Sequence, residues 1–149
     1  MTRSQSLIVS FVASASLIAT AALAGTGIEN APRRMVTNMT GAAEIPGPGD
    51  PDGSGKAILE LEASQNKLCV KLQVKDIQPA TMAHVHLGVA GQAGAPVVQL
   101  DPPTAGTSST CKTIAEDLTR AILKSPANYY VNVHTADFPN GAIRGQLHK

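Results

Sequence analysis

Apolar residues occupy every second position in several short segments of this chain. In residues 68–75, leucine or valine alternates with cysteine, glutamine or lysine, and residues 57–62 show a similar alternation just before. A side-chain period of two belongs to a β-strand with one buried and one exposed face. Glycine, proline and asparagine gather between such segments, where they favour turns. Because the pattern recurs along the chain, it predicts a fold built from short antiparallel strands.

Two further patterns complete the predicted architecture. Residues 101–110 are rich in proline, glycine, serine and threonine and are predicted as a loop. A capping-box pattern at residues 113–116 predicts a helix over residues 114–124. Strands are predicted at residues 57–62, 68–75, 82–89, 97–100, 129–135 and 142–147. The chain is therefore predicted to be an all-β Greek-key β-sandwich or barrel of about six to eight antiparallel strands with one short helix.

The first 24 residues predict an export signal. Fifteen of them are apolar, Arg3 is their one charged side chain, and Ala22-Leu23-Ala24 places small residues at a cleavage position. This is the pattern of a secretory signal peptide cleaved after Ala24, which predicts a secreted or periplasmic protein. Residues 25–38 are predicted as a flexible leader and residues 39–149 as one domain. No second apolar run approaches ~18 residues, so no membrane span is expected after cleavage.

Removing the signal peptide leaves a chain without net charge. The whole chain has 12 Lys+Arg and 11 Asp+Glu, so loss of Arg3 leaves 11 of each. Such a balance does not provide the basic surface that nucleic-acid binding requires. Nucleic acid is therefore not an expected partner.

Cys69 and Cys111 are the two cysteines of the chain. In an exported protein an even pair predicts a disulfide. A redox pair would more often form a C-x-x-C motif, which the sequence does not contain. The pair is therefore predicted to be a structural bond.

Three of the four histidines lie on the same side of predicted strands, opposite the apolar residues. His84 and His86 are two apart on one strand, so both side chains leave the same face, roughly 7 Å apart. His134 has the matching position on the strand of residues 129–135. Neutral imidazole is a good ligand for copper and zinc, so these three residues predict a metal site with one open position. His148 has the same parity and is a fourth candidate ligand, or else part of a frayed terminus.

Other polar residues share the face of the predicted histidine site. Tyr130 and Asn132 are predicted to support the ligands from the strand that carries His134. Arg144 could guide an anion to an open metal position, because its charge persists at any physiological pH. The alternative for Arg144 is structural: an ion pair with Asp137 or a hydrogen bond to a loop carbonyl.

The sequence resembles the CHRD (chordin-type) domain. The resemblance rests on Gly41-Ala-Ala-Glu-Ile-Pro46, Ala83-His-Val-His86, Tyr129-Tyr-Val-Asn-Val-His-Thr135 and Ile143-Arg-Gly-Gln-Leu147. It implies an exported domain and, by analogy with chordin, an extracellular protein partner.

The order of the histidines is also similar to that in Cu/Zn superoxide dismutase. That similarity implies a superoxide-dismutase-like fold, with His84, His86 and His134 as copper ligands and Arg144 as anion guide. Since no histidine lies between His86 and His134, the similarity implies a copper-only site rather than a copper–zinc pair.

Three functions follow as hypotheses. The first is an exported copper protein that acts on superoxide or another small anion, with copper preferred over zinc. The second is a non-enzymatic extracellular binding or adhesion module. The third is a copper store or carrier, in which Met35, Met39 and Met82 would supply thioether ligands.

Overall fold

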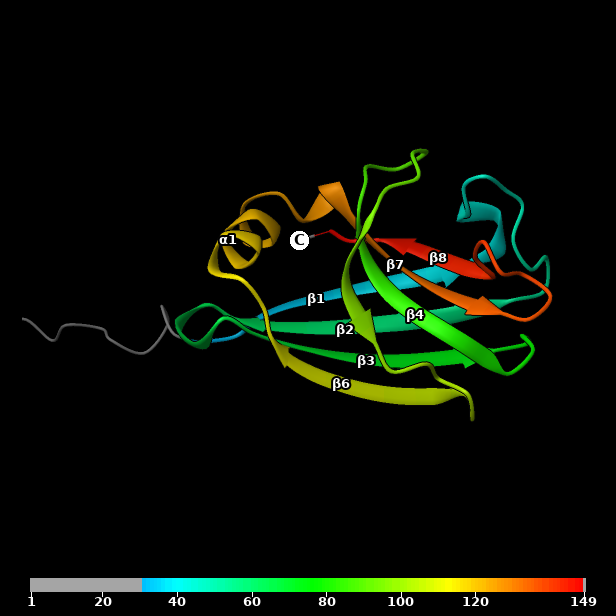
Figure 1. The fold of residues 1–149 in the computed structure, drawn as a ribbon, viewed down its shortest axis with the longest axis horizontal. Coiled ribbons are helices and arrows are strands. Elements are labelled where there is room, and N and C mark those ends of the chain that lie inside the picture. The colour runs from blue at the N-terminus through cyan, green and yellow to red at the C-terminus, as the bar shows by residue number, and fades with distance from the viewer. Residues whose placement is uncertain (1–30, 149) are drawn as a thin grey trace, which may run out of the picture.

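Eight antiparallel strands form one sheet in the computed structural model, which describes residues 31–148. The sheet has the strand order β5-β4-β7-β8-β1-β2-β3-β6. Its strands are β1 (Arg33–Thr40), β2 (Ser54–Glu62), β3 (Lys67–Lys75), β4 (Ala80–Leu87), β5 (Pro96–Leu100), β6 (Thr107–Thr113), β7 (Tyr129–Thr135) and β8 (Ile143–Gln146). The helix α1 (Glu116–Lys124) lies at one end of the sheet (Figure 1). The predicted all-β fold is confirmed; the predicted signal peptide and residues 25–30 of the leader lie outside the described residues.

The sheet curves until it is a nearly closed barrel. In Figure 1, β4 passes in front of β2 and β3. Buried residues of these three strands belong to one hydrophobic cluster. Asp101, directly after the edge strand β5, is hydrogen-bonded to Thr110 of the other edge strand, β6. The backbone N–H of Asp101 donates to Oγ1 of Thr110 at 2.8 Å, and that hydroxyl donates to Oδ2 of Asp101 at 3.0 Å. These bonds hold the two edges together where no backbone ladder joins them.

The period-two pattern of the sequence matches the buried face of the sheet. Alternate residues of each half of the sheet are almost fully buried, and they meet in one hydrophobic cluster. The members with no more than 1 % exposure include Leu59, Leu61, Leu68, Val70, Leu72, Ala83, Val85, Val131, Val133 and Ile143. Burial of these side chains supplies the main driving force for folding.

Two strands were not predicted from the sequence. Residues 33–38, predicted as part of a flexible leader, belong to β1, which is paired along its whole length with β2. Its buried residues are Met35, Thr37 and Met39, a weaker apolar pattern than leucine or valine. Residues 107–110, predicted as loop, begin β6, which has Thr110 as its one buried residue. An edge strand with one buried side chain gives almost no hydrophobic period.

The helix begins later than predicted, because Thr113 is paired with Lys67 in the sheet and does not cap the helix. The capping-box prediction was therefore wrong, although the helix itself is present. None of the helices within residues 31–148 is long and apolar enough to cross a membrane.

The predicted disulfide between Cys69 and Cys111 is present. The two cysteines lie directly opposite each other on β3 and β6, so the bond fixes the edge strand to its neighbour. The closed loop spans a sequence separation of 42 residues, for which the chain-entropy relation gives at most about 4 kcal/mol.

Replacing both cysteines by serine should therefore lower the free energy of unfolding by up to about 4 kcal/mol. Equilibrium urea unfolding of the oxidised wild type and of the double variant measures this difference. Lys71→Ser, on the same face of β3, is the control and should change stability little. An unchanged urea midpoint in the double variant would contradict the prediction.

Candidate metal centre

The outer face of β4, β7 and β8 carries a second, polar layer of buried residues. Tyr130, Asn132, His134 and Arg144 alternate with core residues and so point away from the core, yet none is more than 7 % exposed. Two loops cover them: residues 41–53 after β1 and residues 88–95 after β4 (Figure 1). The histidines predicted from the sequence lie in this layer.

The structure brings His84, His86 and His134 together. One ring nitrogen from each lies within 4.8 Å of the others. His84 and His86 come from β4, and His134 comes from β7, which is paired with β4. His148 is not part of this group. It is exposed, follows the end of β8, and its Nδ1 lies 3.4 Å from the carbonyl oxygen of Gln146.

The hydrogen bonds of His86 and His134 determine which nitrogen of each ring is free. Nδ1 of His86 lies 2.8 Å from the carbonyl oxygen of Gly94, and Nδ1 of His134 lies 3.0 Å from that of Pro139. A carbonyl oxygen can only accept, so each Nδ1 carries the proton and donates it. In a neutral imidazole the other nitrogen then bears a lone pair. Nε2 of both rings is therefore ready to bind a cation, and Nε2 of His86 is buried without a hydrogen-bond partner.

His84 completes the group from its more exposed side. Its Nε2 lies 3.1 Å from Oε1 of Gln99, and its Nδ1 lies 3.2 Å from Nε2 of His134. If Nε2 of His84 donates to Gln99, two lone pairs face each other across 3.2 Å. Such a contact is favourable only with a proton or a metal ion between the two nitrogens. The donor set therefore fits a transition metal bound by Nδ1 of His84 and Nε2 of His86 and His134.

Burial keeps two of the ligand candidates neutral. Desolvation lowers the pKa of His86 and of His134, and it outweighs the hydrogen bonds to Gly94 and Pro139, which act in the opposite direction. The neutral form is the one that binds metal. Outer partners that fix a ligand ring in this way are typical of metal-binding histidines.

Tyr130 separates Arg144 from the histidines. Its ring is stacked on His86 with a centroid distance of 4.7 Å, and the Arg144 guanidinium lies 3.4 Å from its centroid. Because β7 lies between β4 and β8, His86 and Arg144 approach the Tyr130 ring from opposite sides.

Arg144 is bound to the loop that covers the site. It is 2 % exposed and donates to the carbonyl oxygens of Gln92 and Val89 at 2.9 and 3.0 Å. Its other acceptor is Oε1 of Gln146, at 3.1 Å. These bonds match the structural alternative considered for this residue, a hydrogen bond to loop carbonyls. Its use as an anion guide is a prediction that these contacts do not support.

Two polar residues were not predicted from the sequence: Glu44, which lies in the buried layer, and Gln99, which contacts His84 from its exposed side. Glu44 is 3 % exposed, although it lies in a loop rich in glycine and proline. Gly141, at φ +139°, leaves room for it, since a Cβ atom there would overlap the Glu44 carboxyl. The one sequence feature that marks Glu44 is an acidic residue placed between an alanine and an isoleucine. Gln99 is exposed and has no distinguishing sequence pattern.

Glu44 should make stability depend on pH. Burial raises its pKa to about 7, against opposing effects of the Arg144 charge, the Ile45 backbone and the Asn132 side chain. The folded state therefore holds the proton after the unfolded state has lost it, and stability falls as the pH rises from about 4.5 to about 7. Glu44→Gln, which mimics the protonated acid, should be more stable than the wild type at pH 8 by up to about 3 kcal/mol.

Urea unfolding at several pH values between 4 and 8 checks this prediction. The two proteins should have similar stability at pH 4 and diverge as the pH rises. Glu60→Gln is the control. Glu60 lies on β2, is half-exposed and is paired with Arg34 of β1, so it is not buried as Glu44 is. Parallel stability curves for the wild type and Glu44→Gln would show that Glu44 does not retain a proton.

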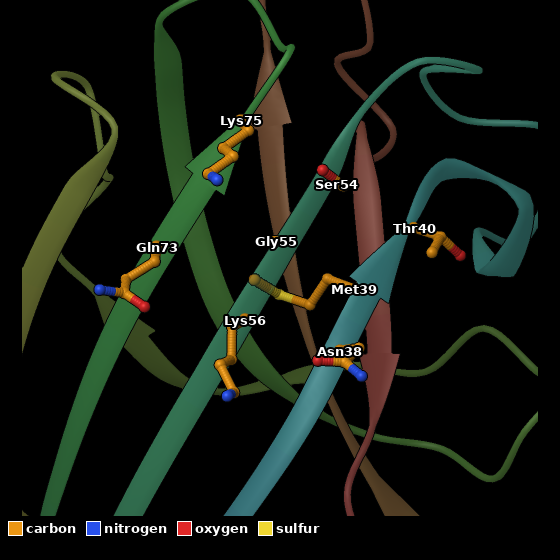
Figure 2. A pocket seen from close by; sticks show the side chains of 8 residues that line it. All are labelled: Asn38, Met39, Thr40, Ser54, Gly55, Lys56, Gln73 and Lys75. Carbon is orange, nitrogen blue, oxygen red and sulfur yellow. The ribbon is translucent and has the colours of Figure 1, made fainter.

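A separate hollow of about 390 Å³ lies on β1, β2 and β3 (Figure 2). Its lining residues are Asn38, Met39, Thr40, Ser54, Gly55, Lys56, Gln73 and Lys75. None of the clustered histidines lines it, and neither does Tyr130, Asn132 or Arg144. It therefore plays no part in the candidate metal centre.

The family model of the CHRD domain matches residues 35–147. No curated protein and no solved structure matches the chain. The matched range begins within β1 and contains all three clustered histidines.

Proposed function

The chain belongs to the CHRD domain family. Because its structure also brings three imidazole side chains together, we propose that the protein is exported and binds one copper ion. His84, His86 and His134 are the ligands. The proposal is carried by one observation: backbone carbonyls fix the proton on Nδ1 of His86 and His134, so that both Nε2 atoms face the cluster as lone pairs. The expected location, secreted or periplasmic, rests on the pattern of residues 1–24.

Copper is preferred over zinc for two reasons. Among divalent first-row metals, nitrogen ligands bind Cu(II) most tightly. The disulfide also supports an oxidising compartment, where copper can be held as Cu(II). Bound copper would supply a one-electron couple between Cu(II) and Cu(I).

The reaction that this site supports best is superoxide dismutation. Two superoxide anions and two protons give one dioxygen and one hydrogen peroxide, so electrons and atoms balance. The chain's own contribution is to hold three imidazole ligands and to leave access beside His84, the most exposed of the three. A small anion would approach from that side, because Tyr130 and the 88–95 loop cover the other.

A copper carrier is the second candidate, and Met82 favours it. Met82 is 41 % exposed, lies two residues before His84, and is the register partner of His134. A thioether at the rim suits Cu(I). Met35 and Met39, the other candidate thioethers, are 2 % and 1 % exposed and belong to the core, so that prediction was wrong for them.

One experiment separates the candidates. The mature chain is loaded with Cu(II), its copper content is measured, and superoxide decay is followed with apo-protein as control. One copper per chain with catalysed decay supports the enzyme. One copper without decay supports the carrier. Absence of stoichiometric copper would overturn the metal proposal and favour the extracellular binding module.

A further inference from the structure

Three buried side-chain atoms in the polar layer have no hydrogen-bond partner: Nε2 of His86, Oδ1 of Asn132 and Oε1 of Glu44. Asn132 and Glu44 are each 3 % exposed. Such atoms are rare in folded proteins, because an unpaired buried polar group is costly. Two of them, on His86 and Asn132, lie on the paired strands β4 and β7 and call for a common explanation.

Asn132 lies beside the histidines. On β7 it is directly opposite His84, and it shares the face of Tyr130 and His134.

The strand register places the Asn132 side chain among the clustered histidines. His84 is directly opposite it on β4, His86 is opposite Tyr130, two residues before it, and His134 is two residues after it on the same face of β7. Side chains at directly opposite and diagonal positions of a strand pair lie within reach of one another. The unpartnered oxygen of Asn132 is therefore buried beside the unpartnered nitrogen of His86.

We propose that Oδ1 of Asn132 is a fourth ligand of the metal. This inference rests on the proposed function, because it needs the three histidines to bind a metal. It converts a three-nitrogen site into a site with three nitrogens and one oxygen.

An amide oxygen has a distinct effect on copper. Oxygen is a harder ligand than sulfur or imidazole nitrogen and favours the harder ion Cu(II). Loss of the oxygen should therefore raise the Cu(II)/Cu(I) reduction potential. A merely structural asparagine would not produce that shift.

The test compares wild type, Asn132→Ala and Asn132→Asp, each loaded with one equivalent of Cu(II). We expect Asn132→Ala to bind copper on the order of 10- to 100-fold more weakly, with a changed Cu(II) electron paramagnetic resonance spectrum and a higher potential. Asn132→Asp restores an oxygen ligand and should return the spectrum and the potential toward the wild type. Asn38→Ala, in the separate hollow of Figure 2, is the matched control and should match the wild type.

A second measurement uses the wild type alone, so that it does not depend on the folding of variants. With Zn(II) as a diamagnetic probe, the side-chain amide signals of Asn132 should move and those of Asn38 should not. If wild type binds copper but Asn132→Ala keeps its affinity, spectrum and potential, Asn132 is not a ligand, while the proposed function stands. If wild type binds no copper, both proposals fail.

Discussion

Replacing Arg144 by methionine is expected to lower the free energy of unfolding by about 3 to 5 kcal/mol. Methionine has a similar length but no donors, so the carbonyl oxygens of Val89 and Gln92 lose their partner. An acceptor left unpaired in a buried layer costs about 1 to 3 kcal/mol. The contact of the guanidinium with the Tyr130 ring is lost as well.

Arg144→Lys should recover only part of this loss. Lysine keeps the charge near Glu44 but cannot reproduce the planar fork that reaches two carbonyls and one amide. Arg120→Met is the control, since Arg120 is an exposed partner of Glu116 on α1 and contributes about 0.5 kcal/mol or less. Urea unfolding at pH 7 measures all three variants.

The effect of Arg144 should also be local. Hydrogen exchange at residues 88–95 should become faster in Arg144→Met, because this side chain fastens that loop to β8. A double-mutant cycle with Glu44→Gln isolates the charge interaction between the two buried groups. A change of less than about 1 kcal/mol in Arg144→Met would contradict the structural role that the contacts indicate.

The sequence predicted those strands in which leucine and valine alternate with polar residues. The strands β2, β3 and β7 carry this pattern, so their buried faces follow from a simple period. The strand β1 buries methionine and threonine, and β6 buries Thr110 alone. Their positions depend on pairing with β2 and β3, which a local pattern does not encode.

The same distinction applies to the site. His84, His86 and His134 could be predicted because parity on a strand determines which face a side chain occupies. The position of Glu44 could not be predicted. It lies in an irregular loop, where no repeating pattern in the sequence shows which side chains face the sheet. The role of Arg144 stayed open for a related reason: its acceptors lie in residues 88–95, far away in the sequence.

Replacing any one of the clustered histidines should abolish tight copper binding. We expect His86→Ala and His134→Ala to weaken the affinity for Cu(II) at least about 100-fold, since outer partners alone contribute 10- to 100-fold. Each variant removes one of three ligands held within 4.8 Å of one another. Affinity is measured by competition with a chelator of known strength, and His148→Ala is the matched control because His148 lies outside the cluster.

Thermal stability gives an independent reading of the same variants. A ligand that binds only the folded state stabilises it, by about 2.7 kcal/mol at a free concentration 100 times Kd. Copper should therefore raise the Tm of wild type and of His148→Ala, and leave that of His86→Ala and His134→Ala nearly unchanged. The metal-free variants are expected to be less stable than wild type, since the carbonyls of Gly94 and Pro139 lose their donors, so each is compared with its own apo form. A copper-dependent rise in Tm that persists in both variants would place the metal elsewhere in the protein.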